Sequence, residues 1–198
     1  NNITVTYSGD DIYAGKTSNT IVHVKKVRIV ADNMKRGWDS PYDYLSKIVD
    51  EDGNPLANRN VTFVVDGKQY NATTDGSGIA KLSAGLAVGK HEVNVTEQLS
   101  GASATANATI VKRLLENRDL TKDYESSKHY KVRAIGDDGN PVGKGVVVKI
   151  ITNGVTYNAK TDKNGYATLP IHLKPKKYTV TSKYHKTTVK NKLVVKQT

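Results

Sequence analysis

Residues 50–96 read DEDGNPLANRNVTFVVDGKQYNATTDGSGIAKLSAGLAVGKHEVNVT, and residues 136–182 repeat the pattern as GDDGNPVGKGVVVKIITNGVTYNAKTDKNGYATLPIHLKPKKYTVTS. The register extends upstream, where Trp38 lies opposite Tyr124 and Tyr44 opposite Tyr130. We place the one extra residue of the second copy at Asn153, in a hairpin turn. A period of this length is too long for a solenoid unit and fits a whole small domain.

Apolar side chains alternate with polar ones in both copies, as at Val61, Phe63 and Val65. A period of two marks strands with one buried face. Asp-Gly and Asn-Gly turns separate these strands, because Gly and Asn tolerate positive φ. We therefore predict an all-β chain of two tandem Ig-like β-sandwich domains of about seven strands each. Tyr178 begins the next-to-last strand, where a tyrosine corner is expected, and His91 takes that place in the first domain.

Three segments follow from the repeat. Residues 25–112 form the first domain and residues 113–198 the second. Residues 3–24 resemble residues 178–196, so we interpret residues 1–24 as the last two strands of a preceding repeat, and we expect them to pair with a neighbouring sheet edge or another copy of the chain. The boundary at 112–116 lacks Gly and Pro, which predicts a stiff, extended joint.

Composition excludes several classes of protein. The absence of Cys rules out disulfides and thiolate chemistry, and no apolar run approaches the roughly 18 residues of a membrane span. Residues 1–112 carry 12 basic and 12 acidic residues, whereas residues 113–198 carry 18 basic and 7 acidic ones, which is the whole net charge of +11. The second domain is therefore a polycation, and the sequence implies no cofactor.

Three motifs of the second domain are distinctive: Asn-Arg-Asp-Leu-Thr at 117–121, Thr-Asp-Lys-Asn-Gly-Tyr-Ala-Thr-Leu at 161–169 and Leu-Lys-Pro-Lys-Lys-Tyr-Thr-Val-Thr at 173–181. They resemble the Ig-like repeats of archaeal adhesin-like proteins, the large cell-surface proteins of methanogens. The resemblance implies an extracellular stalk or adhesive segment that binds other cells or surfaces beside further repeats, and it supplies no catalytic residues. The Thr-Asp-X-X-Gly-X-Ala turn also occurs in prealbumin-like adhesin domains, so the strand topology stays open.

Candidate binding residues fall into three groups. The first group is predicted to bind a polyanion and consists of Lys174, Lys176, Lys177, Lys183, Lys186, Lys190 and Lys192. For an exported protein, the predicted polyanion is a cell-wall polymer rather than nucleic acid. Trp38, Tyr42 and Tyr124 lie in loop-like sequence suited to sugar stacking, although repetition of Trp38 and Tyr124 at one place favours a structural plug. Five Asn-X-Thr sequons, at Asn2, Asn60, Asn71, Asn94 and Asn107, favour a glycosylated extracellular surface.

The sequence predicts no enzyme. His23, His91, His129 and His185 sit singly on predicted strands, without a nucleophile motif or metal spacing. Acidic residues at 51–52 and 137–138 resemble the start of a calcium loop, but Pro55 and Pro141 favour plain turns and no metal is predicted. An internal Lys-Asn isopeptide bond through Asn107 or Asn191 stays open, although no Lys is repeated in register.

Overall fold

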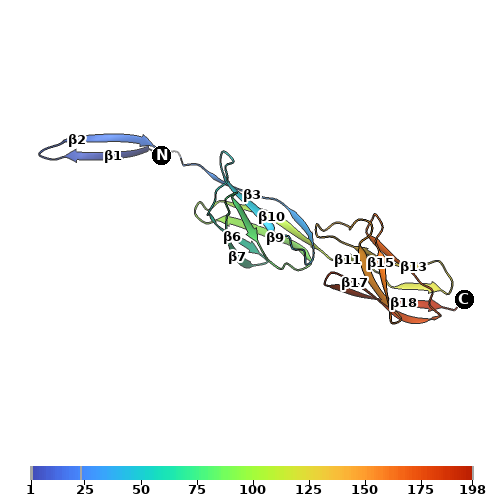
Figure 1. The fold of residues 1–198 in the computed structure, drawn as a ribbon. Helices are drawn as coiled ribbons and strands as arrows, with labels where there is room; N and C mark the ends of the chain where they lie inside the picture. Colours follow the sequence, from blue (N-terminus) through green and yellow to red (C-terminus); the bar gives the residue numbers. More distant parts are fainter. Residues whose placement is uncertain (1, 23, 198) are drawn as a thin grey trace.

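The computed structural model describes residues 2–22 and 24–197, and Figure 1 shows a hairpin followed by two sandwiches placed end to end. Within that described part, no helix is long and apolar enough to cross a membrane. The hairpin consists of β1 (Asn2–Gly9) and β2 (Ala14–Ile21).

The first sandwich packs a three-stranded sheet against a five-stranded one. The smaller sheet has the order β3 (Val27–Ala31), β5 (Tyr44–Asp50), β8 (Ile79–Leu82). The larger sheet has the order β4 (Met34–Gly37), β10 (Ser103–Val111), β9 (Gly89–Glu97), β6 (Asn60–Val65), β7 (Lys68–Thr73).

The second sandwich repeats that arrangement. Its smaller sheet has the order β11 (Leu114–Leu115), β13 (His129–Ala134), β16 (Tyr166–Pro170). Its larger sheet has the order β12 (Leu120–Asp123), β18 (Thr187–Lys196), β17 (Lys176–Tyr184), β14 (Val147–Thr152), β15 (Val155–Lys160). The predicted all-β fold of two tandem sandwiches is confirmed, with the same topology in both.

Each sandwich has eight strands rather than about seven, because its first strand is split between the two sheets. β3 pairs with β5, and the chain then crosses so that β4 pairs in parallel with β10. The crossing is fixed by equivalent side chains: Asn33 accepts a hydrogen bond from the Asn107 amide (2.8 Å), and Asp119 accepts one from the Lys192 amide (2.8 Å). Period-two patterning carries no signal for such a change of sheet.

The extra residue of the second copy is not Asn153, and that placement was wrong. The two-residue turns Asp66-Gly67 and Asn153-Gly154 are equivalent, since each closes a hairpin between paired strands. The insertion lies upstream, in the loop at 142–146, which replaces the loop at 56–59. Alternation alone cannot locate an insertion in a loop, because only the buried face fixes the register.

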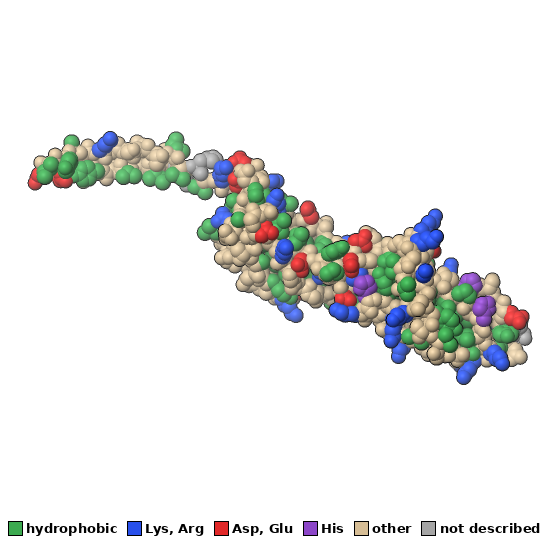
Figure 2. Space-filling model, viewed as in Figure 1, with side chains coloured by type: hydrophobic (Ala, Val, Ile, Leu, Met, Phe, Trp, Pro, Cys, Tyr) green, Lys and Arg blue, Asp and Glu red, His purple; other side chains and the backbone are tan. Residues whose placement is uncertain are grey.

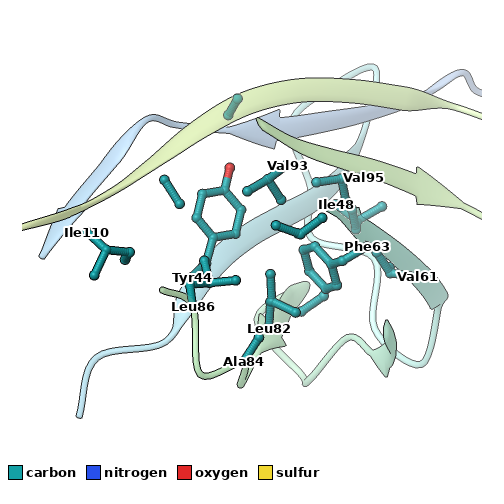
Figure 3. Packing of buried hydrophobic residues seen from close by; sticks show 14 residues of the cluster. Tyr44, Ile48, Val61, Phe63, Leu82, Ala84, Leu86, Val93, Val95 and Ile110 are labelled. Atoms are coloured by element: carbon teal, nitrogen blue, oxygen red, sulfur yellow. The ribbon is translucent and has the colours of Figure 1, made fainter. Parts of the chain in front are cut away.

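Each sandwich has its own apolar core. Tyr44 and Phe63 meet edge to face in the first core, with ring centroids 6.3 Å apart (Figure 3). Tyr130 occupies the position of Tyr44 in the second core, and its hydroxyl hydrogen-bonds Ser182 (3.1 Å) and Asn191 (2.9 Å). The hydroxyl of Tyr44 is buried and has no hydrogen-bond partner among the described residues, and burial raises the pKa of Tyr44 to about 12. In the first domain, Val95 and Ala106 take the places of Ser182 and Asn191. Their side chains cannot accept a hydrogen bond from the Tyr44 hydroxyl.

This pair gives a matched prediction. Tyr130→Phe is expected to destabilise the second domain by about 1–2 kcal/mol, because it removes two buried hydrogen bonds and leaves Asn191 short of a donor. Tyr44→Phe is expected to leave the first domain unchanged or to stabilise it, because it removes an unsatisfied polar group. Chemical denaturation of both variants is the measurement, and equal losses would contradict the assignment.

The tyrosine corner is confirmed, since the Tyr178 hydroxyl donates to the carbonyl of Lys174 (2.9 Å). His91 makes the same four-residue contact in the first domain, where Nε2 lies 2.8 Å from the carbonyl oxygen of Ala87. Its other ring nitrogen lies 2.7 Å from a carboxylate oxygen of Asp66. His91 is therefore a structural replacement for the corner tyrosine.

The N-terminal hairpin forms a two-stranded sheet of its own among the described strands, so pairing with a sheet edge within the chain is contradicted. Its apolar side chains Ile3, Val5 and Tyr7 are exposed on one face, and Figure 2 shows such side chains along its length. Pairing with another copy stays a prediction. The hairpin contributes its surface to neither core.

Deleting residues 1–20 is expected to leave the melting temperatures of both sandwiches nearly unchanged. The physical reason is that the hairpin shares neither core nor sheet with the first domain. Differential scanning calorimetry of the shortened chain is the test. A large fall in the first transition would show that the hairpin belongs to that domain.

Candidate functional site

The two sandwiches meet at a backbone-to-backbone joint. The amide of Gly37, at the end of β4, donates to the carbonyl of Asp137 (3.0 Å). A Cβ at Gly37 would lie 2.4 Å from the carbonyl oxygen of Gly136, so only glycine fits there. A Cβ at Gly139, whose φ is +74°, would lie 2.8 Å from Lys35 Cγ and 3.1 Å from the backbone of Arg36, across the same joint. Close approach of two backbones leaves little room for bending at this joint.

Arg113 lies at the centre of the joint and is fully buried. Its guanidinium donates to the carbonyls of Trp38 (2.5 Å) and Ile135 (3.3 Å), one in each domain. It also pairs with a carboxylate oxygen of Asp137 (2.5 Å). The planar group with five donors suits such a three-way contact. Sequence reasoning missed Arg113, because a single Arg at a boundary carries no periodic signal.

A pocket of about 490 Å³ opens beside the joint, between the turn after β4 and the loop that follows β8. Trp38, Asp39 and Pro41 line one wall, and residues 83–86 line the other. Lys186 of the second domain reaches its rim and pairs with Asp39 (3.1 Å). The hydrogen bond from Lys186 lowers the pKa of Asp39. The floor holds Arg36, which donates to the carbonyls of Tyr42 and Ala84.

The second domain has an equivalent pocket of about 430 Å³ at its far end. Tyr124 takes the place of Trp38, and Lys122 takes the place of Arg36 with its own two carbonyls, Ser126 (2.6 Å) and Ile171 (2.8 Å). Asp39 and Glu125 share a positive φ, 68° and 69°. Each sandwich therefore ends in the same structure: a buried cation, an aromatic side chain and a polar rim.

The three aromatic residues predicted to stack on sugar do not form one surface. Trp38 packs against the first core and lines the first pocket, as expected for a plug. Tyr124 lines the other pocket and is 38% exposed. Tyr42 is exposed and lines neither pocket. Trp38 and Tyr124 line separate, equivalent pockets, as their repeat positions predict, and Tyr42 does not join Trp38 in the first one; sugar stacking stays a prediction.

The predicted lysines also divide. Lys177, Lys183, Lys190 and Lys192 point outward from the five-stranded sheet of the second domain, since they alternate with buried residues. Lys186 lies in the joint. Lys174 lies in the loop before β17, and Lys176 is the first residue of β17. Lys149, Lys160 and Lys196 share the outward face and were missed, because their face depends on strand register.

Four of the five sequon asparagines gather on one surface. Asn60, Asn71, Asn94 and Asn107 all point outward from the five-stranded sheet of the first domain. Asn2 lies on the exposed hairpin. Glycosylation of these residues stays a prediction, and it would cover one whole sheet face of the first domain only.

The histidines and the acidic turn residues do not converge on one site, and the turn acids stabilise their own turns. His129 and His172 line the second pocket, and His185 lies in the turn after β17 rather than on a strand. His23 lies outside the described residues. Asp50 and Asp138 accept turn hydrogen bonds from Asn54 and Asn140. Among residues 2–22 and 24–197, no group of three or more His, Asp or Glu residues could hold a metal ion.

Asn107 and Asn191, the two asparagines considered for an isopeptide cross-link, form hydrogen bonds with other groups. The Asn107 side chain lies beside Asn33 (3.4 Å), and Asn191 accepts from Tyr130 and donates to the carbonyl of Asn117 (3.3 Å). These contacts are ordinary strand and crossover hydrogen bonds.

No protein-family model matches the chain, and no curated protein sequence matches it. A tandem of titin domains I9–I11 is similar in structure, with a TM-score of 0.47 and 11% identity, over 93% of this chain and 70% of that one. A Ca²⁺-stabilised ice-binding adhesin of an Antarctic bacterium has a TM-score of 0.33 and 17% identity, over 100% of this chain and 57% of its own. The bacterial integrin-binding protein invasin has a TM-score of 0.33 and 15% identity, over 86% of this chain and 39% of that one.

Proposed function

We propose that this chain is a stalk segment of a cell-surface adhesin that attaches its cell to other cells or surfaces. The joint supports this proposal: two sandwiches follow each other end to end and are locked by Gly37, Gly139 and Arg113 (Figure 1). A stiff joint holds a distal binding site at a fixed distance from the cell. In this role the chain is extracellular and not an enzyme, in line with its resemblance to the repeats of archaeal, methanogen adhesin-like proteins.

Further Ig-like repeats of the same protein are the proposed neighbours of the chain. The hairpin β1–β2 matches β17–β18 in sequence, and its exposed Ile3, Val5 and Tyr7 would need a sheet to cover them. We assign it as the closing hairpin of a preceding repeat.

The stiffness of the stalk is measurable because the chain has no Cys. Spin labels on Thr73→Cys and Lys160→Cys occupy equivalent exposed positions at the ends of β7 and β15. Electron–electron resonance is expected to give one narrow distance distribution. A broad distribution, at native stability of both domains, would refute the stalk proposal.

A second candidate function, binding of carbohydrate or cell-wall polymer, is favoured by the paired pockets that hold Trp38 and Tyr124. Each combines one aromatic ring with polar side chains, as sugar sites do. Trp38 is the single tryptophan of the chain, so its fluorescence reports directly on the first pocket. Titration with solubilised wall oligosaccharides is expected to shift that fluorescence, and an unchanged spectrum of Trp38 would count against this pocket.

A further inference from the structure

We infer that the outward face of the five-stranded sheet in the second domain binds a linear anionic polysaccharide along an oblique track of lysines. The track consists of Lys149, Lys160, Lys177, Lys183, Lys190, Lys192 and Lys196. This inference adds a ligand class to the proposed adhesive role and rests on it only in placing the chain outside the cell. It does not depend on the stiffness of the joint.

Strand register puts the seven lysines on one face. Directly opposite residues in a ladder share a face, and Lys183 pairs with Lys149 while Lys190 pairs with Thr181. The intervening residues Val180, Ser182 and Leu193 are buried. Because each strand rises roughly 3.3 Å per residue, outward neighbours such as Lys190 and Lys192 are about 7 Å apart along the strand.

The lysines form a path rather than a scattered set. Lys196 lies on β18 beside the β12 edge, and Lys177 lies next along on β17. Lys192 and Lys190 follow on β18, the Lys183–Lys149 pair bridges β17 and β14, and Lys160 ends the path on β15. The path therefore crosses the sheet obliquely from β18, next to the β12 edge, to the edge strand β15, as a linear polymer would lie.

Among the described residues, acids in register with this face lie only at its β12 edge, where Asp123 stands directly opposite Lys196. Within residues 2–22 and 24–197, the ion pairs found involve none of the seven lysines. The nearest acids in register are Asp119 and Asp123, at the β12 edge. Lys149 and Lys183 stand directly opposite each other, and such a like-charge pair is unfavourable until an anion lies between them.

The first domain shows that the fold does not require these lysines. Its equivalent outward positions are Thr62, Thr73, Lys90, Thr96, Thr105, Asn107 and Val111. One of those seven positions is basic, and Glu92 lies on the same face. The fold itself therefore requires at most one lysine on this face, and the other six in the second domain call for a further cause.

The chemistry between the lysines favours a charged sugar polymer over nucleic acid. Thr179, Thr181 and Asn158 lie on the same outward face and can exchange hydrogen bonds with sugar hydroxyls. Tyr157 and Tyr178 instead face the core, and rings beside the track are confined to one end, where Tyr184 and His185 line a hollow with Lys149 and Lys183. Lysine ammonium groups bind carboxylate or sulfate as point charges.

The test exchanges face lysines for the residues that the first domain carries there. The triple variant Lys149→Thr, Lys183→Thr, Lys190→Thr uses Thr62, Thr96 and Thr105 as its templates. A control with equal charge loss, Lys128→Thr, Lys144→Thr, Lys163→Thr, changes only loops. Biolayer interferometry with polygalacturonate is expected to show binding by the wild-type chain, weakened about tenfold or more in the face variant and little in the loop control.

Dextran sulfate, neutral dextran and a DNA duplex complete the comparison. Binding of dextran sulfate as well identifies sulfate as a second accepted group and supports the track, and neutral dextran is expected not to bind. Equal losses of affinity in both triple variants, or binding of DNA as tight as that of polygalacturonate, would show that only net charge matters. Either result would overturn the inference. No polygalacturonate binding by the folded wild-type chain would also overturn it. The distance distribution between spin labels tests the stalk separately.

Discussion

Arg113→Ala is expected to uncouple the two domains and to lower the free energy of unfolding by about 3 kcal/mol, the usual cost of breaking a buried charged contact. The substitution leaves the carbonyls of Trp38 and Ile135 without their donor and Asp137 without its partner. It also empties the volume of the largest fully buried side chain in the described structure. The interdomain distance distribution should broaden at the same time.

Arg28→Ala is the matched control. Arg28 occupies the equivalent place on β3, one residue before the strand pair of Ile29 and Ile48, and it is exposed. Its removal is expected to change stability by less than about 0.5 kcal/mol. Calorimetry and spin-label distances measure both variants. If Arg113→Ala behaved like Arg28→Ala, the joint would depend on the glycine contacts alone.

Phe63→Ala is expected to destabilise the first domain by about 3–5 kcal/mol, the range for removing a large aromatic side chain from a packed core. Phe63 is fully buried and meets Tyr44 edge to face. The second core shares no residue with the first, so the transition of the second domain should stay in place. The variant should therefore split a calorimetric scan into two well-separated peaks.

Val64→Ala serves as its control. Val64 is the next residue on β6 but points outward and is 37% exposed, so its truncation should cost little. Circular dichroism at intermediate temperature should show about half of the strand signal lost in Phe63→Ala. Simultaneous unfolding of both sandwiches would mean that the joint makes them one cooperative unit.

The regular parts of the fold were predictable because burial leaves a mark every second residue. Val61, Phe63 and Val65 alternate as a half-buried strand should, and all three are buried. Tyr178 was identified from its place at the start of a strand, and its contact with Lys174 confirms it. The repeat also predicted that Trp38 and Tyr124 would occupy equivalent places.

The joint and the lysine track were beyond the sequence for a physical reason. Contacts such as Arg113 with Trp38 join residues far apart in loops, where no period reports on neighbours. Lys149 belongs with Lys183 only through the register of β14 and β17. A list of lysines cannot show this register, which is why Lys186 was grouped with the wrong set.

The parallel pairing of β4 with β10 decides how the sandwich responds when its ends are pulled. The chain enters through β3, crosses to β4 and leaves through β10, and the pairs Met34–Ala108 to Gly37–Val111 join β4 to the last strand. Tension on parallel strands slides one along the other, so all hydrogen bonds of the ladder stretch together. β12 and β18 repeat this arrangement.

In the antiparallel hairpin, Asn2 lies opposite Ile21, so the same tension opens it one pair at a time. Under rising force the hairpin should therefore lengthen first, and single-molecule extension in which a sandwich yields before it would contradict this order.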